Sequence, residues 1–220
     1  MIRNRRQKIN RIVNKIQNGI SEINERYRSG PDLYFYRRLM TLRNQTPNVS
    51  AFLQNDYNIE ILYATLVAWD MNSRAAKMKY FDEFKESILS TVNQLQQLEG
   101  LFAQQQPQQN EVLLMLQTLY SNLKLMKGHG KLVSNSKLLH FLFPTSLTPM
   151  DRKNTLQFFY GNTGESSNKY LEITGVTFDI MAMDVNWQAY LDNVWNTSVP
   201  KLIDNAILLI EGHSLTNNGG

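Results

Sequence analysis

Apolar residues recur at intervals of three and four along most of the 220-residue chain, a spacing that places them on one face of an α-helix. The clearest run begins near the N-terminus, with successive intervals of four, three, four, three and four: Ile9, Val13, Ile16, Ile20, Ile23 and Tyr27. These intervals are typical of a coiled-coil seam. Because the seam covers only about three heptads, we expect it to pack either within its own chain or against a second copy.

The same helical spacing recurs in three later segments, 81–102, 112–126 and 202–210. Segment 59–69 is apolar nearly all round the helix, which predicts a central, buried helix. Gly128 is expected to end the helix before it, and Gly212 to follow the end of the last one, because glycine readily adopts the left-handed conformation found there. Together these segments predict an all-α fold, a single compact bundle of about eight to ten helices. The exception is 171–178, whose β-branched and aromatic residues could form a short strand, although a helix that begins near Phe178 is preferred.

The same pattern divides the chain into three parts. Residues 1–30 form a basic N-terminal helix, and residues 31–212 form the helical domain. Within that domain the glutamine-rich stretch 104–109 is expected to be a solvated connector, because it cannot bury apolar surface. Residues 213–220 are expected to be a flexible tail.

Charge is distributed unevenly along the chain, although the net charge is only +4. Residues 1–43 hold eleven Lys or Arg and three Asp or Glu, whereas residues 165–220 hold two and seven. Arg3, Arg5 and Arg6 in the basic arm are candidates to neutralise nucleic-acid phosphates, since binding there releases condensed counterions. The arm could equally dock on the acidic end of a second copy or be a solvated helix face.

Composition excludes several classes of protein. The chain has no cysteine, so it forms no disulfide and has no thiolate chemistry. It has no run of about 18 apolar residues and no signal-peptide core, so we expect a cytoplasmic protein with no membrane partner. His129, His140 and His213 are too far apart for a helical zinc pair, and no nucleotide-binding fingerprint occurs. We therefore expect no metal and no cofactor.

One segment, Gly128 to Asp151, contains a pattern associated with chemistry. Gly128, His129, Gly130 and Lys131 lie between two predicted helices, and Asp151 lies at the head of a third. Glycines let a backbone approach a phosphate closely and direct N–H groups at it. Each residue also has a structural interpretation. Gly128 would end a helix, Asp151 would cap one, and Lys137 would be an exposed helix lysine.

This pattern distantly resembles the helix-hairpin-helix DNA glycosylase superfamily, over residues 112–160 only. The resemblance implies that Gly128, Gly130 and Lys131 hold a DNA phosphate and that Asp151 assists departure of a flipped base. It further implies a lysine nucleophile, for which Lys137 is preferred to Lys131. The run from Ser136 to Asp151 also resembles uncharacterised all-α proteins of bacteria and archaea.

Two hypotheses of different classes follow. In the first, the chain binds DNA through its basic arm and the Gly128 hairpin, with a degenerate glycosylase-like site at Asp151 and Lys137. In the second, it is a non-enzymatic interaction module that binds a partner or forms a homo-oligomer through residues 9–27.

Overall fold

The computed structural model describes residues 1–27, 30–71, 77–105 and 108–216, with side chains as far as Gly212. The all-α fold is confirmed. Within these ranges lie twelve α-helices and three short π or 3₁₀ helices, and the β-pairing is an isolated bridge between Met78 and Met126. The number exceeds the expected eight to ten, because predicted helices such as 81–102 are interrupted. In the described ranges no helix is both long and apolar enough to cross a bilayer.

The helices group into two compact units. The first unit comprises the described parts of Met1–Arg28 and Pro144–Gly220, and the second those of Ser29–Phe143. The helices of the first unit are α1 (Arg5–Gly19), α2 (Glu22–Arg26), η2 (Arg152–Leu156), α10 (Gln157–Tyr160), α11 (Ser167–Met181), η3 (Trp187–Tyr190) and α12 (Val199–Thr216).

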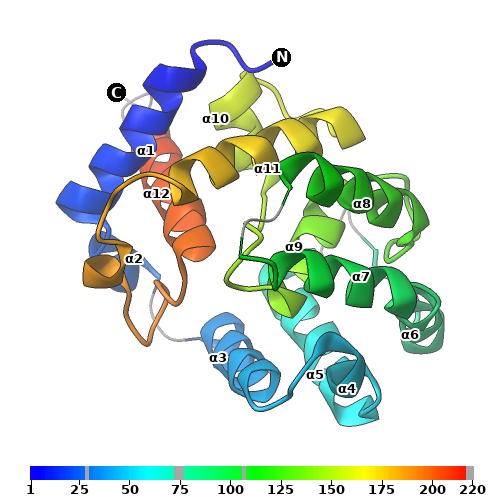
Figure 1. Cartoon of the computed structure of the whole chain (residues 1–220). Coiled ribbons are helices and arrows are strands. Elements are labelled where there is room, and N and C mark those ends of the chain that lie inside the picture. The colour runs from blue at the N-terminus through cyan, green and yellow to red at the C-terminus, as the bar shows by residue number, and fades with distance from the viewer. Residues whose placement is uncertain (28–29, 72–76, 106–107, 217–220) are drawn as a thin grey trace. The chain divides into compact units, whose positions relative to one another are not determined.

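The heptad seam packs inside the first unit. Figure 1 shows α1 beside α12, against which it makes its most extensive contact. Val13, Ile16 and Ile20 of the seam are buried, as are Leu202 and Ile203 on α12. The predicted helix is interrupted at Ile20 and Ser21, so that α1 and α2 are separate. The sequence left open whether the seam packs within its own chain or against a second copy. In the structure it packs within its own chain, against α12.

The preferred helical state near 178 is confirmed, but the strand alternative for 171–178 is wrong, and so is the expected helix start near Phe178. The segment lies inside α11, which begins at Ser167, and the hydroxyl of Ser166 caps that helix by accepting a hydrogen bond from the Lys169 amide. Thr174 donates its hydroxyl proton to the Tyr170 carbonyl at 2.9 Å, an intrahelical bond. Burial of one apolar face of this helix outweighs the strand preference of its β-branched residues.

The second unit surrounds a central helix, α5 (Asp56–Leu66), which contacts α3 (Pro31–Asn44), α4 (Val49–Leu53), α6 (Phe81–Leu89) and α9 (Leu132–Leu142). α5 continues into a π-helix, η1 (Val67–Met71). Beside α4 lies α7 (Val92–Phe102), which packs on α8 (Gln109–Asn122), as Figure 1 shows.

The C-terminal helix is longer than the sequence predicts. α12 extends to Thr216, so the expected helix end at Gly212 is wrong. Parts of the predicted connector 104–109 and of the predicted tail 213–220, namely 106–107 and 217–220, lie outside the described residues.

Candidate functional site

The predicted Gly-x-Gly hairpin is an exposed loop. α8 ends at Asn122, so the prediction that Gly128 ends this helix is wrong. The chain leaves α8 in an extended conformation and pairs with the segment before α6, with the Lys79 amide donating to the Leu125 carbonyl at 2.9 Å. Gly128 is exposed, and a methyl group added to it would meet no atom within 4 Å. Packing therefore does not require glycine here.

Lys131 is held at the end of α8. Its ammonium group donates to the Ser121 carbonyl at 2.9 Å, in the last turn of the helix, where unpaired carbonyls favour a cation. Partial burial lowers the pKa of Lys131, and the neighbouring positive charge of Lys124 lowers it further.

Lys137 is half-buried, and its ammonium group donates to the Trp69 carbonyl at 2.7 Å. Trp69 and Asp70 are at the irregular end of η1, where Asp70 has a left-handed φ of 64°. Lys137 thus donates to a backbone carbonyl at the irregular end of η1. One turn along α9, His140 is fully buried, and its Nε2 lies 3.0 Å from the Tyr36 hydroxyl.

Asp151 is the N-cap of η2, as its structural interpretation predicted. Its Oδ1 accepts hydrogen bonds from the backbone amide and the side-chain amide of Asn154, both at 2.9 Å. Its own amide donates to the Thr155 hydroxyl.

The charge of Asp151 also affects Tyr27. Burial raises the pKa of Tyr27, against an opposing effect of Arg26, and the carboxylates of Asp204 and Asp151 raise it further.

The predicted site residues divide between the two units. Asp151 belongs to the first unit, together with Arg3, Arg5 and Arg6, whereas Lys137 and the loop 128–131 belong to the second. Within the second unit, Lys137 and His140 share helix α9.

The basic arm is partly engaged inside the first unit. Arg5 pairs with Asp179 of α11, and both side chains are about 44% exposed. Lys8 and Arg11 lie over the Phe158 ring, at 5.0 and 5.2 Å from its centroid. Burial lowers the pKa of Lys8, and Arg11 lowers it further, against an opposing effect of Glu211.

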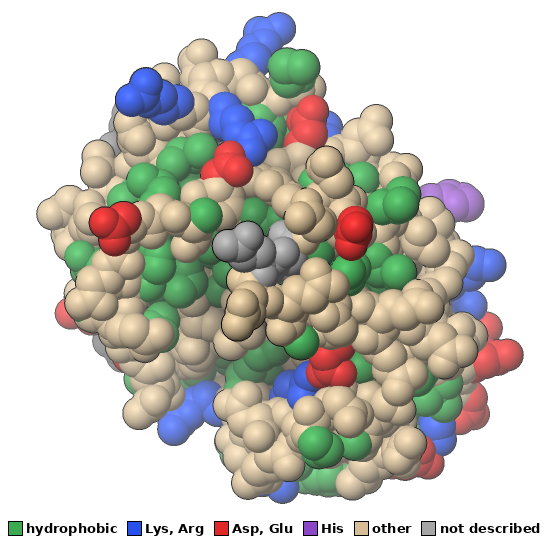
Figure 2. All heavy atoms as spheres, viewed as in Figure 1, with side chains coloured by type: hydrophobic (Ala, Val, Ile, Leu, Met, Phe, Trp, Pro, Cys, Tyr) green, Lys and Arg blue, Asp and Glu red, His purple; other side chains and the backbone are tan. Residues whose placement is uncertain are grey.

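Arg3 and Arg6, in contrast, are not engaged in ion pairs with the described part of the first unit. Both are exposed, and neither forms an ion pair with a described residue. In Figure 2 the blue side chains at the top of the molecule, near the start of α1 in Figure 1, stand apart and have red ones near them. Anion binding there would therefore depend on individual arginines and not on a continuous cationic surface.

A polar cluster at the start of α12 was not identified from the sequence. Lys201 is 2% exposed, and its ammonium group donates to Asp204 Oδ2 at 2.6 Å and Asn205 Oδ1 at 2.8 Å. Asn205 in turn donates to the Asn196 side chain and the Trp195 carbonyl. Such a buried pair persists only when its members are hydrogen-bonded, and we interpret it as structural.

Asp192 extends this polar cluster. Burial would raise the pKa of Asp192, but hydrogen bonds from Asn24, Asn196 and the Val194 amide outweigh it and hold the pKa below its usual value. Aspartate often accepts a hydrogen bond from the amide two residues later, which forms an Asx-turn. Asp192 does so with the Val194 amide, and this local preference is the feature of the sequence that points to Asp192.

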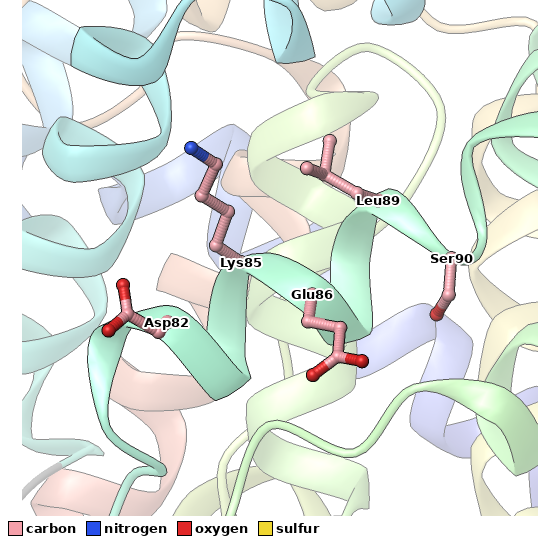
Figure 3. A pocket seen from close by; sticks show the side chains of 5 residues that line it. All are labelled: Asp82, Lys85, Glu86, Leu89 and Ser90. Atoms are coloured by element: carbon pink, nitrogen blue, oxygen red, sulfur yellow. The ribbon is translucent and has the colours of Figure 1, made fainter.

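A surface depression on the second unit lies along one side of α6, lined by Asp82, Lys85, Glu86, Leu89 and Ser90. In Figure 3 these side chains point in different directions and do not converge on a common point. Lys85 is already paired with Asp56 of α5 at 2.7 Å. The depression therefore lacks the convergent polar groups typical of a ligand site.

In the part of the chain that the structure describes, no three His, Asp or Glu side chains are grouped to hold a metal ion. Comparison of the chain with protein-family models, with curated proteins and with solved structures gives no match in any of the three.

Proposed function

We propose that the chain binds nucleic acid through its basic N-terminal arm, with Arg3 and Arg6 at the exposed end of the arm in contact with phosphates. The seam of α1 is directed at α12, so the opposite side of the N-terminal segment faces solvent. We call that side, together with the exposed N-terminal end of the chain, the outer face of α1. Its exposed residues are cationic or carry amides: Arg3 and Arg6 at the N-terminal end, and Gln7, Asn10, Asn14, Gln17 and Asn18 along the helix.

The observation that carries the proposal is the absence of acidic residues from the N-terminal segment itself, since the carboxylates that pair with its end, Glu172 and Asp179, belong to α11. No Asp or Glu occurs between Met1 and Ser21, whereas six Lys or Arg do. Phosphate contacts supply most of the sequence-independent affinity for nucleic acid. Asparagine and glutamine side chains are also common donors to phosphates and bases. The outer face of α1 therefore has the composition of a backbone-binding surface.

Base-excision chemistry at Asp151 and Lys137 stays a prediction. The contacts of both residues are those of structural groups, since Asp151 caps η2 and Lys137 holds the Trp69 carbonyl. We accordingly expect the chain to bind an intact duplex and a duplex with an abasic site equally well.

The test is fluorescence anisotropy with labelled duplex DNA at two salt concentrations. Replacing Arg3 and Arg6 together by glutamine is expected to weaken binding, and to reduce the slope of log K against log salt by about 0.9 for each phosphate that is no longer neutralised. The control removes the same charge from exposed lysines elsewhere, Lys77→Gln with Lys153→Gln, and is expected to bind like the wild type.

Two results would contradict the proposal: wild-type binding too weak to detect at low salt, and equally weakened binding in the two double variants. A clear preference for the abasic duplex that Asp151→Asn abolishes would contradict the expectation of equal binding and support the glycosylase-like hypothesis.

A further inference from the structure

We infer that an exposed tyrosine–arginine surface on α3 and α5 binds single-stranded nucleic acid by base stacking. This surface consists of Tyr34, Arg37 and Arg38 of α3 and Tyr57 of α5, two helices that pack together in the second unit. The inference rests on the proposed nucleic-acid binding and names the form of nucleic acid that this second surface would take.

The aromatic rings of this surface are unusually open. Tyr34 is 67% exposed and Tyr57 is 45% exposed, whereas Tyr36 on the same helix is fully buried. Folding thus divides the aromatic run of α3 into one core anchor and one ring on the surface. Phe35 contacts the Tyr34 ring edge-on, with 5.4 Å between centroids. That contact orients the ring, while most of the residue remains in solvent.

Two arginines share this surface. Tyr34, Arg37 and Arg38 lie three and four positions apart, on one side of α3. The Arg38 guanidinium is 5.9 Å from the centroid of the Tyr57 ring, and both arginines are exposed. Neither forms an ion pair within the described ranges of the chain. A planar cation beside an exposed ring can neutralise a phosphate or stack on a base.

Carboxylates on the same two helices limit the positive charge of this surface. α3 and α5 carry three acidic residues: Asp32, Asp56 and Glu60. Asp32 accepts a hydrogen bond from the Leu33 amide at the start of α3, and Asp56 is paired with Lys85. Asp32 and Glu60 both keep their negative charge, because a hydrogen bond from an amide does not neutralise a carboxylate. The positive charge of the surface is therefore confined to the two guanidinium groups themselves, beside the exposed rings.

These features favour a single strand over a duplex. Bases in a duplex stack on one another, so their faces are closed to a protein side chain. A single strand offers those faces to aromatic rings and its phosphates to arginines, at about 1–3 kcal/mol for each stacked base. The outer face of α1, in contrast, has no tyrosine, phenylalanine or tryptophan between Met1 and Arg26, and is expected to bind duplex phosphates.

The experiment compares the full-length chain with three variants on a labelled oligodeoxythymidine of about 12 nucleotides, within the usual site size. Tyr34→Ala is expected to lower affinity for the oligonucleotide roughly tenfold, with duplex affinity unchanged. Tyr34→Phe keeps the ring and is expected to bind like the wild type. Tyr80→Ala is the control, because Tyr80 is 71% exposed in the same unit and lies outside this surface.

The outcomes separate this inference from the proposed function. Duplex binding without oligonucleotide binding, or an undiminished affinity of Tyr34→Ala, would overturn the inference and leave the role of Arg3 and Arg6 intact. An equal loss of affinity in Tyr34→Ala and Tyr34→Phe would also overturn it, because the ring would then not be the binding group. Absence of binding to both probes would overturn both proposals.

Discussion

Asp192 illustrates how a single carboxylate organises the loop before α12. It accepts hydrogen bonds from the Val194 and Asn196 amides at 2.7 and 2.9 Å, and from the side chains of Asn24 and Asn196 at 2.8 Å. Asn24 lies in α2, so the carboxylate links the N-terminal segment to the loop. Four donors around one ionised group stabilise its charged form.

This environment makes part of the stability depend on pH. Because folding lowers the pKa of Asp192, its stabilising contribution is complete above the unfolded value of about 3.9. It is lost as the pH falls through the lower, folded-state value. We expect Asp192→Asn to lower the free energy of unfolding by about 1–2 kcal/mol at pH 7, and the difference from wild type to shrink below about pH 4.

Urea unfolding at pH 7 and at pH 3 measures both effects. Asp184→Asn is the matched control, since Asp184 is exposed, and it should unfold like the wild type at both values. A pH-independent difference between Asp192→Asn and wild type would contradict the interpretation.

A second residue, Glu99 of α7, has a similar role in the second unit. Both oxygens of its carboxylate share the single N–H of Val49 at the start of α4, at 3.0 and 2.9 Å, and the carboxylate pairs with Arg43 of α3. Arg43 also donates to the Leu142 carbonyl at the end of α9. The Arg43–Glu99 pair and its hydrogen bonds therefore link α7 to three helices that are not adjacent to it in the sequence, α3, α4 and α9.

Among the helices, α1 shows what a periodic pattern can and cannot specify. The heptad spacing predicts that the apolar residues share one face of the helix, but that face can pack against α12 or against a second copy equally well. In the structure α12 covers it, and Ile16 is 1% exposed. Self-association through residues 9–27 would therefore require α1 to leave α12.

This arrangement predicts the result of truncating the seam. Ile16→Ala should destabilise the protein by about 2–4 kcal/mol, because it leaves a cavity between α1 and α12. The sedimentation coefficient of the folded protein should not change. Gln17→Ala, at the exposed neighbouring position, should change neither quantity. Dissociation of an oligomer in Ile16→Ala at unchanged stability would favour the interaction-module hypothesis instead.

At the scale of the whole molecule, the two units differ in how the chain forms them. The second unit is one continuous stretch, whereas the first joins the two ends of the chain. α12, in the C-terminal part, buries its apolar side against α1, in the N-terminal part. The second unit is thus able to form its helix contacts without chain from outside it, and the first unit is not.

We therefore expect a fragment of residues 29–143 to fold alone, with a helical circular-dichroism spectrum and a cooperative urea transition. The fragment 144–220 should lack a cooperative transition until a peptide of residues 1–28 is added, which should restore it. Cooperative unfolding of 144–220 alone would contradict this expectation. So would failure of the fragment 29–143 to fold.

The sequence alone determined the all-α class, the seam in α1 and the cap at Asp151. These features depend on periodicity and on hydrogen bonds between residues close in the chain. Only the tertiary structure decided that α12 covers the seam, that 171–178 is helical and that Lys137 binds the Trp69 carbonyl. The same is true of the exposure of Tyr34 and the burial of Tyr36. In each case the deciding partner lies far away in the sequence, and local preferences carry no information about it.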